Sequence, residues 1–226
     1  EQVYFGLAAT NSTDDQQVIP FFQPERERFL EYDLTKLIHN LAFPKKTVVG
    51  LVTGLPLEGD IMAAMRGQPM VPYVVVNEMR QLYDVKTLST EFDKVPADVD
   101  VLMIAHPQHL SDKTLYAIDQ FVLKGGRALV FVDPDSETQH MHPSQLNPPN
   151  APNDSDLPKL FAAWGVRLVP KMVVGDREAA RKVNAGTESQ VQAVDYVAWL
   201  SLKKPNFDHS DLITADLSQI NMATAG

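Results

Sequence analysis

Polar or small residues stand where several apolar runs of the sequence end. Thr53 and Gly54 end the run KTVVGLVTG, His106 ends VDVLMIAH, and Asp133 ends RALVFVD. Continuous apolar runs suit buried parallel strands, and open α/β sheets bind ligands at the carboxyl ends of such strands. We therefore take Thr53, Gly54, His106 and Asp133 as the candidate ligand-binding residues.

Each of these residues also has a purely structural interpretation, which the sequence leaves open. Gly54 suits a turn, while His106 precedes Pro107 as a loop residue. Asp133 precedes Pro134, where aspartate is common as a turn or cap residue.

The stretch LKGGRALVFVDP raises the question of whether Gly125 and Gly126 cradle a phosphate. A dinucleotide fingerprint needs a strand, then the glycine turn, then a helix whose N-terminus meets the phosphate. Here the helix precedes the glycines and offers its carbonyl end, which repels anions. We predict a helix cap with one glycine at positive φ. Neither GxxxxGK[ST] nor GxGxxG occurs in the chain.

Other routes to catalysis or metal binding find little support. The chain has no cysteine, which excludes disulfides, thiolate metal sites and cysteine nucleophiles. His140 and His142 have a spacing that can chelate a metal, but nothing nearby completes a site. Ser111 stands near His106 and His109 without a GxSxG elbow, and a helix cap explains it. We expect no catalytic residue, no metal and no cofactor.

Composition is that of an ordered globular protein, with 44% hydrophobic and 22% charged residues. The formal net charge of −9 would repel a phosphate backbone, so we expect no nucleic-acid partner. The densest basic spots are Lys45-Lys46 and Lys203-Lys204, which we interpret as solvated loop ends. No signal peptide and no apolar run long enough to span a bilayer appears.

Periodicity predicts a mixed α/β order of elements. Residues 2–9 and 17–22 suit a hairpin, and residues 26–43 suit an amphipathic helix that packs on a sheet. Residues 46–54 and 99–133 predict a parallel strand and then a strand-helix-strand unit. Between them, residues 55–73 predict a long connection that is either lid-like or partly mobile, followed by a helix near 73–83 and a short strand at 84–88.

The C-terminal part is less regular. Residues 135–156 are polar and proline-rich and predict a flexible loop. A short helix at 157–164, a strand at 166–176 and a strand at 190–202, antiparallel at an edge, should follow. We expect a single domain over 1–226, with a possible subdivision into a core at 1–134 and an extension at 157–226. The ends of the sequence suggest a fragment of a longer protein.

Whole segments of the chain resemble the auxiliary components of ABC-type transport systems, including the GldG-like gliding-motility auxiliary proteins. The resemblance is carried by four stretches that follow the family's order: VIPFFQPERERFLEYDLTKLI, KTVVGLVTGLP, DVLMIAHPQHLSDKTLYAIDQFVLKGGRALVFVDP and LPKLFAAWGVRLVPKMVVGD. None of them is a catalytic motif.

This resemblance implies a flavodoxin-like sheet similar to class I glutamine amidotransferases, with helices on both faces. It also implies a membrane-anchored, extracytoplasmic (periplasmic) domain at the inner membrane, which works beside an ABC permease and ATPase. The amidotransferase nucleophile is a cysteine, which this chain lacks, so that chemistry is excluded.

Two functions follow as hypotheses. The first is a non-enzymatic binding or coupling domain, with a transporter subunit or an envelope ligand as its partner. The second is a sugar or peptide sensor, or a degenerate enzyme, that uses the strand-end pocket.

Overall fold

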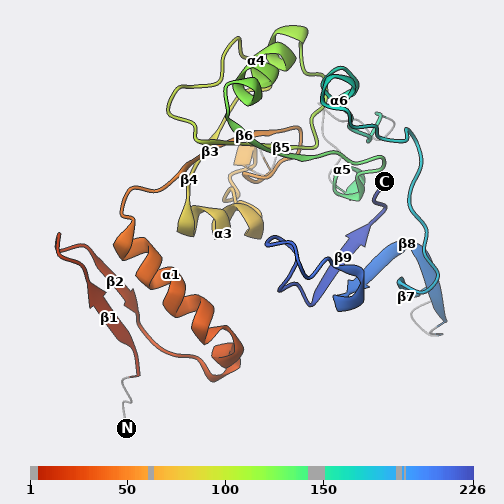
Figure 1. Cartoon of the computed structure of the whole chain (residues 1–226). Coiled ribbons are helices and arrows are strands. Elements are labelled where there is room, and N and C mark those ends of the chain that lie inside the picture. The colour runs from red at the N-terminus through yellow and green to blue at the C-terminus, as the bar shows by residue number, and fades with distance from the viewer. Residues whose placement is uncertain (1–4, 61–63, 142–150, 187–189, 191) are drawn as a thin grey trace.

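The apolar runs predicted as central strands form one parallel sheet. Figure 1 shows the computed structural model, which describes residues 5–60, 64–141, 151–186, 190 and 192–226. The sheet has four strands in the order β4-β3-β5-β6, and all neighbours run parallel, which confirms the predicted fold class. Their bounds are β3 (Val48–Thr53), β4 (Asp84–Thr87), β5 (Val101–Ala105) and β6 (Arg127–Phe131).

Helices cover both faces of this sheet, because alternate residues of its central strands are buried on opposite sides. In Figure 1, α4 (Asp112–Leu123) and α6 (Pro158–Trp164) lie over one face and α3 (Val74–Leu82) over the other. On the first face, Val52, Ile104 and Ile118 belong to one buried cluster. On the second face, Leu51 and Val76 belong to another.

The short helix α6 is part of the core of the parallel sheet. Leu160 and Phe161 are buried in the cluster that β3, β5 and α4 share. Trp164 also hydrogen-bonds α4, because its indole Nε1 donates to Asp119 Oδ1 at 3.1 Å. Pro158 stands in the first turn and Gly165 ends the helix at a φ of 74°, as predicted. The possible subdivision of the chain into 1–134 and 157–226 stays a prediction.

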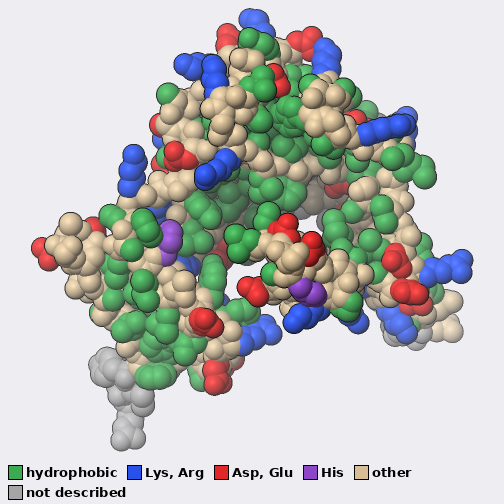
Figure 2. Space-filling view, in the orientation of Figure 1, with side chains coloured by type: hydrophobic (Ala, Val, Ile, Leu, Met, Phe, Trp, Pro, Cys, Tyr) green, Lys and Arg blue, Asp and Glu red, His purple; other side chains and the backbone are tan. Residues whose placement is uncertain are grey.

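The second face of the sheet is only partly covered. Leu129 and Phe131 of β6 pair with Met103 and Ala105 of β5 and share their face. Met103 and Ala105 are buried, whereas Leu129 and Phe131 are 51% and 50% exposed. Val74 on α3 is exposed as well. Figure 2 shows hydrophobic side chains gathered around α3 in the hollow beneath the sheet.

The N-terminal hairpin is confirmed, with β1 (Leu7–Thr10) antiparallel to β2 (Gln16–Ile19). After it, η1 (Pro24–Phe29) leads into α1 (Leu30–Ala42), which packs against β2. The helix therefore contacts the two-stranded hairpin rather than the parallel sheet. A pair of short strands covers only a narrow stripe of a helix, so Leu37 is its buried residue and Ile38 faces solvent.

A separate antiparallel sheet forms at the C-terminus from β7 (Ala180–Asn184), β8 (Ala193–Lys203) and β9 (Gln219–Ala223). The short η2 (Lys204–Asn206) follows β8. The predicted strand at 190–202 is confirmed as antiparallel, but its predicted edge position is wrong. β8 pairs with β7 on one side and with β9 on the other.

The predicted strand at 166–176 is also wrong. These residues form turns and irregular backbone, because Pro170 has no N–H to donate to a ladder and Lys171 adopts a φ of 57°. Val174 makes a single backbone bond to Ala225 at 2.7 Å.

Part of the predicted loop 135–156 is ordered and links the two larger sheets. Its described residues include the helix α5 (Glu137–Met141). Trp199 of β8 donates its Nε1 proton to Glu137 Oε1 at 2.5 Å, and Thr224 Oγ1 donates to the Asp135 carbonyl at 2.7 Å. The segment that follows β6 therefore lies between the parallel sheet and the C-terminal sheet. Among the described residues, no helix has both the length and the apolarity to cross a bilayer.

Candidate functional site

The candidate residues Thr53, Gly54 and His106 meet at the topological switch point of the sheet. The chain leaves β3 toward β4 on one side, and later leaves β5 toward β6 on the other. In sheets of this kind the crevice for a ligand forms between two such strands. Here the Gly54 N–H donates to the His106 carbonyl oxygen at 3.2 Å. The two strand ends are therefore joined directly by a backbone hydrogen bond.

His106 is the most unusual residue at this edge. Its side chain is 3% exposed, and its φ is 50°, a left-handed value that costs energy in any residue with a Cβ. Its ring Nε2 lies 2.7 Å from Gln139 Oε1, which can only accept, so Nε2 carries the proton in the neutral ring. Ring Nδ1 is buried and has no hydrogen-bond partner among the described residues.

Two glutamines close the strand ends over His106. Gln139 of α5 is buried, and its Oε1 also accepts from Gln108 Nε2 at 3.1 Å. Gln108 Nε2 reaches the carbonyls of Pro152 and Asp154 at 3.1 and 2.9 Å. The two amides therefore lie over the strand ends, at the edge where open α/β sheets bind ligands.

Asp133 follows β6 at the same edge of the sheet, close to His106. Its N–H donates to Ser155 Oγ at 2.9 Å, and its Oδ1 accepts the Asp135 N–H at 3.0 Å in a tight turn. Burial raises the pKa of the Asp133 carboxyl above its ordinary value. The hydrogen bond from the Asp135 N–H and the charge of the nearby His106 ring lower this pKa. The carboxylates of Asp135 and Glu137 raise it further. Burial outweighs the bond and the ring, so the charged form is disfavoured here.

We expect Asp133→Asn to stabilise the protein at neutral pH. The amide keeps an Oδ1 that can accept the Asp135 N–H but carries no charge to bury. The pKa of Asp133 is higher in the folded protein than in the unfolded chain, where it is about 4. The protonated carboxyl therefore favours folding fully at a pH below about 4. This contribution is lost as pH rises through the folded pKa. The advantage of the Asp133→Asn variant in urea unfolding should therefore be small near about pH 3 and grow toward about pH 7.

Asp98 offers a control with the opposite sign. Its pKa is lowered, first by the hydrogen bond to Lys86. The charged Asp98 carboxylate stabilises the fold at a pH above its unfolded pKa. Asp98→Asn removes this contribution, so any change in the free energy of unfolding at neutral pH should be a decrease. An Asp133→Asn advantage that is equal at both ends of the pH range would contradict the burial of the carboxylate.

The remaining candidates have structural roles. Thr53 Oγ1 accepts the Leu55 N–H at 3.0 Å, which fixes the turn after β3. Ser111 caps α4, where its Oγ accepts the Thr114 N–H at 3.3 Å, as predicted. The interpretation of Gly125 and Gly126 as a helix cap is also confirmed. Gly125 has a φ of 90° and bonds Val122, while Gly126 bonds Phe121 in a Schellman arrangement.

The connection after β3, predicted as a lid, is fastened at its described ends. The Tyr73 N–H donates to the Leu57 carbonyl at 2.9 Å, and Leu57 is buried under α3. Arg80 Nη2 contacts both carboxylate oxygens of Glu58 at 2.8 Å. Residues 61–63 lie outside the described part of the chain, as do His142 and the side chain of His140.

Sequence reasoning missed Gln108, Gln139 and Ser155, which complete the strand-end cluster. Gln139 and Ser155 stand in a polar stretch without periodicity, so no pattern distinguishes them from solvated loop residues. Gln108 follows His106-Pro107, and its place just past a strand end was the one available signal. Within the described ranges, no group of three or more His, Asp or Glu side chains is placed to hold a metal.

Comparison with known proteins identifies one matching family. Searches of curated proteins and of solved structures found no match. The family described as an ABC-type uncharacterized transport system matches residues 46–226, which is most of the chain. That range begins just before β3 and includes the parallel sheet, the strand-end cluster and the C-terminal sheet. The chain therefore belongs to the family of auxiliary components of ABC-type transport systems.

Proposed function

We propose that this chain is a non-enzymatic coupling domain that docks on the permease of its transport system at the extracytoplasmic face of the inner membrane. The observation that carries the proposal is the closed strand-end cluster. An open α/β sheet offers a substrate the crevice at its switch point. Here Gln139 Oε1 bonds both His106 Nε2 and Gln108 Nε2 in that place.

The uncovered side of the sheet supports a protein partner. Leu129 and Phe131 leave apolar surface beside the buried Met103 and Ala105, and the edge of β6 is not paired to another described strand. A contiguous exposed apolar patch can mark a protein–protein interaction site. The family makes a transporter subunit the expected partner. The sensor hypothesis has less support, because its pocket is filled by the chain's own side chains.

Site-specific cross-linking tests the docking. The chain has no cysteine, so a single cysteine can be placed at Phe131 and coupled to a photoreactive label. In native membranes the full-length protein with Phe131→Cys should cross-link to the permease subunit, identified by mass spectrometry. Lys113→Cys is the matched control, because Lys113 is exposed on α4 over the opposite face of the sheet.

Two outcomes would contradict the proposal. One is that neither permease nor ATPase co-purifies with the full-length protein in mild detergent. The other is that Phe131→Cys and Lys113→Cys label the permease equally, which would mean that this face of the sheet has no special role.

A further inference from the structure

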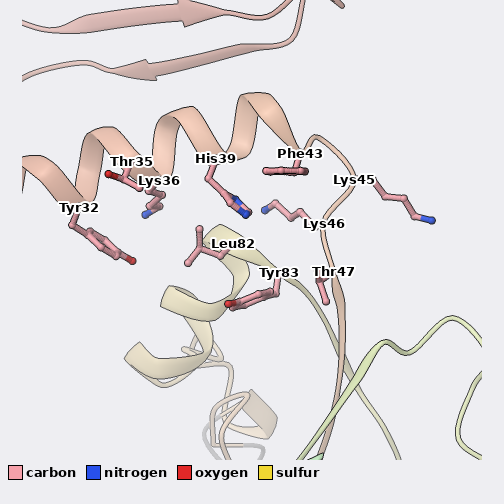
Figure 3. Close-up of a pocket in the computed structure, with 10 residues that line it drawn as sticks. All are labelled: Tyr32, Thr35, Lys36, His39, Phe43, Lys45, Lys46, Thr47, Leu82 and Tyr83. Carbon is pink, nitrogen blue, oxygen red and sulfur yellow. The ribbon is translucent and has the colours of Figure 1, made fainter. Parts of the chain in front are cut away.

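A cavity lies away from the strand ends, between α1 and the end of α3 (Figure 3). It has a volume of about 440 Å³ and is lined by one side of α1, by Phe43 and residues 45–47 after it, and by Leu82 and Tyr83 at the end of α3. Pockets for small organic ligands typically measure about 300 to 1,000 Å³. The size of this cavity therefore suits a small molecule.

The charge of the cavity is opposite to that of the chain. The protein carries a formal net charge of −9, yet the cavity is lined by Lys36, Lys45, Lys46 and His39. None of the described residues that line it has a carboxylate. In Figure 3, Lys36, Lys46 and His39 lie between the two helices, while Lys45 points away. Lys45 and Lys46 are both exposed, as the sequence predicts, but the Lys46 side chain turns toward α3.

The two inward lysines bond only neutral oxygens among the described residues. Lys46 Nζ donates to the Arg80 carbonyl at the end of α3 at 2.8 Å, and Lys36 Nζ donates to Gln81 Oε1. No ion pair with a carboxylate joins either lysine in the described part of the chain. An ammonium has three N–H donors, so each lysine keeps donors for a ligand. Within the described residues, neither ammonium is therefore neutralised by a direct ion pair.

Aromatic rings form the rest of the surface. Tyr32 and Phe43 come from α1 and the residue after it, and Tyr83 follows α3. All three are partly exposed, at 49%, 63% and 39%. The Lys36 ammonium already lies 5.9 Å from the centre of the Tyr32 ring. Ring faces next to ammonium groups suit a ligand that is apolar in its body and anionic at one end.

We propose that this cavity binds a small soluble organic anion. Its carboxylate, sulfonate or phosphate group meets Lys36 and Lys46, and its planar apolar body packs on Tyr32, Phe43 and Tyr83. The adjacent cavity of about 500 Å³ shares Lys36 but is also lined by Asp33 and Glu78, whose carboxylates disfavour an anion there. The anion site is therefore confined to the side of Lys46. It is independent of docking through β6.

A pair of matched probes tests the site. Anilinonaphthalene sulfonate is an aromatic anion whose emission rises on binding, and N-phenyl-1-naphthylamine has the same aromatic body without the charge. Lys36→Gln/Lys46→Gln should weaken binding of the sulfonate about tenfold, because each lysine donates a charge-assisted hydrogen bond. The same change should leave binding of the uncharged amine within about twofold, since the apolar contacts remain.

Lys45→Gln is the control, because it removes an equal charge one residue away from a side chain that points out of the cavity. It should change sulfonate binding less than about twofold. Glutamine at position 46 can still donate to Arg80, and circular dichroism checks that the double variant folds. If it does not fold, Lys36→Gln alone and the loss of wild-type sulfonate binding at high salt give the same test.

Three results would overturn the proposal. The first is equal weakening by Lys45→Gln and by the double variant. The second is equal loss of the sulfonate and the uncharged amine. The third is sedimentation with vesicles of phosphatidylglycerol that depends on Lys36 and Lys46, without any effect on sulfonate binding, because it would assign the lysines to a membrane surface.

Discussion

Gly54→Ala is expected to lower the free energy of unfolding by about 3 kcal/mol. A Cβ at this position would stand 2.8 Å from the His106 carbonyl oxygen. That oxygen belongs to the backbone and accepts the Gly54 N–H, so relief of the clash must separate the strand ends and weaken the bond. Urea unfolding followed by circular dichroism measures the loss as a lower midpoint at an unchanged slope.

Gly175→Ala provides the control for Gly54→Ala. A Cβ at Gly175 would meet Val197 at an ordinary contact distance of 3.7 Å, and the residue is exposed. Its free energy of unfolding should change by less than about 0.5 kcal/mol. Equal effects of the two alanines would mean that the close approach of Gly54 to His106 has no energetic weight.

Phe161→Ala is expected to cost about 4 kcal/mol. Phe161 is buried against β3, β5 and α4, so its truncation leaves a cavity in the main core. The loss should appear in one cooperative transition of the chain, because α6 completes the core that the earlier strands begin. The same urea series measures it.

Phe43→Ala removes the same atoms from a ring that is mostly exposed. It should cost less than about 1 kcal/mol. A small effect of Phe161→Ala, or a separate early transition confined to the residues after 157, would show that α6 folds with the C-terminal extension rather than with the parallel sheet.

The parallel sheet was predictable because its signals are local and strong. Central strands read as continuous apolar runs, and β3 and β5 fall inside the two predicted runs. The helix ends were also predictable, because certain residue types favour the backbone conformations found there. Ser111 and Pro158 begin helices, and Gly125 and Gly165 follow helix ends at positive φ. Each depends on a few neighbouring residues.

Two predictions failed, one for a local reason and one because of a contact between distant segments. The strand predicted at 166–176 has enough apolar residues, but Pro170 denies it a ladder partner. Ile38 has helical spacing, yet nothing in the sequence says that its helix meets a narrow hairpin.

The sequence predicted where the candidate residues lie, but not that two glutamine side chains cover them. The strand-end rule places Thr53, Gly54 and His106 together, and the structure brings them together. Their closure by Gln108 and Gln139 joins residues 31 apart through polar side chains. Such bonds have no periodic signature, so composition alone cannot distinguish an open crevice from a filled one.

The two tryptophans of the chain lie at two different joints, Trp164 between α6 and α4 and Trp199 between β8 and α5. Each indole N–H bonds a carboxylate, so each emission spectrum reports whether its own joint is intact. In Trp199→Phe the remaining indole reports on the parallel sheet alone, and in Trp164→Phe the other reports on the link to the C-terminal sheet. The protein thus carries two intrinsic fluorescent probes. One reports on the contact between α6 and α4, and the other on the contact between β8 and α5.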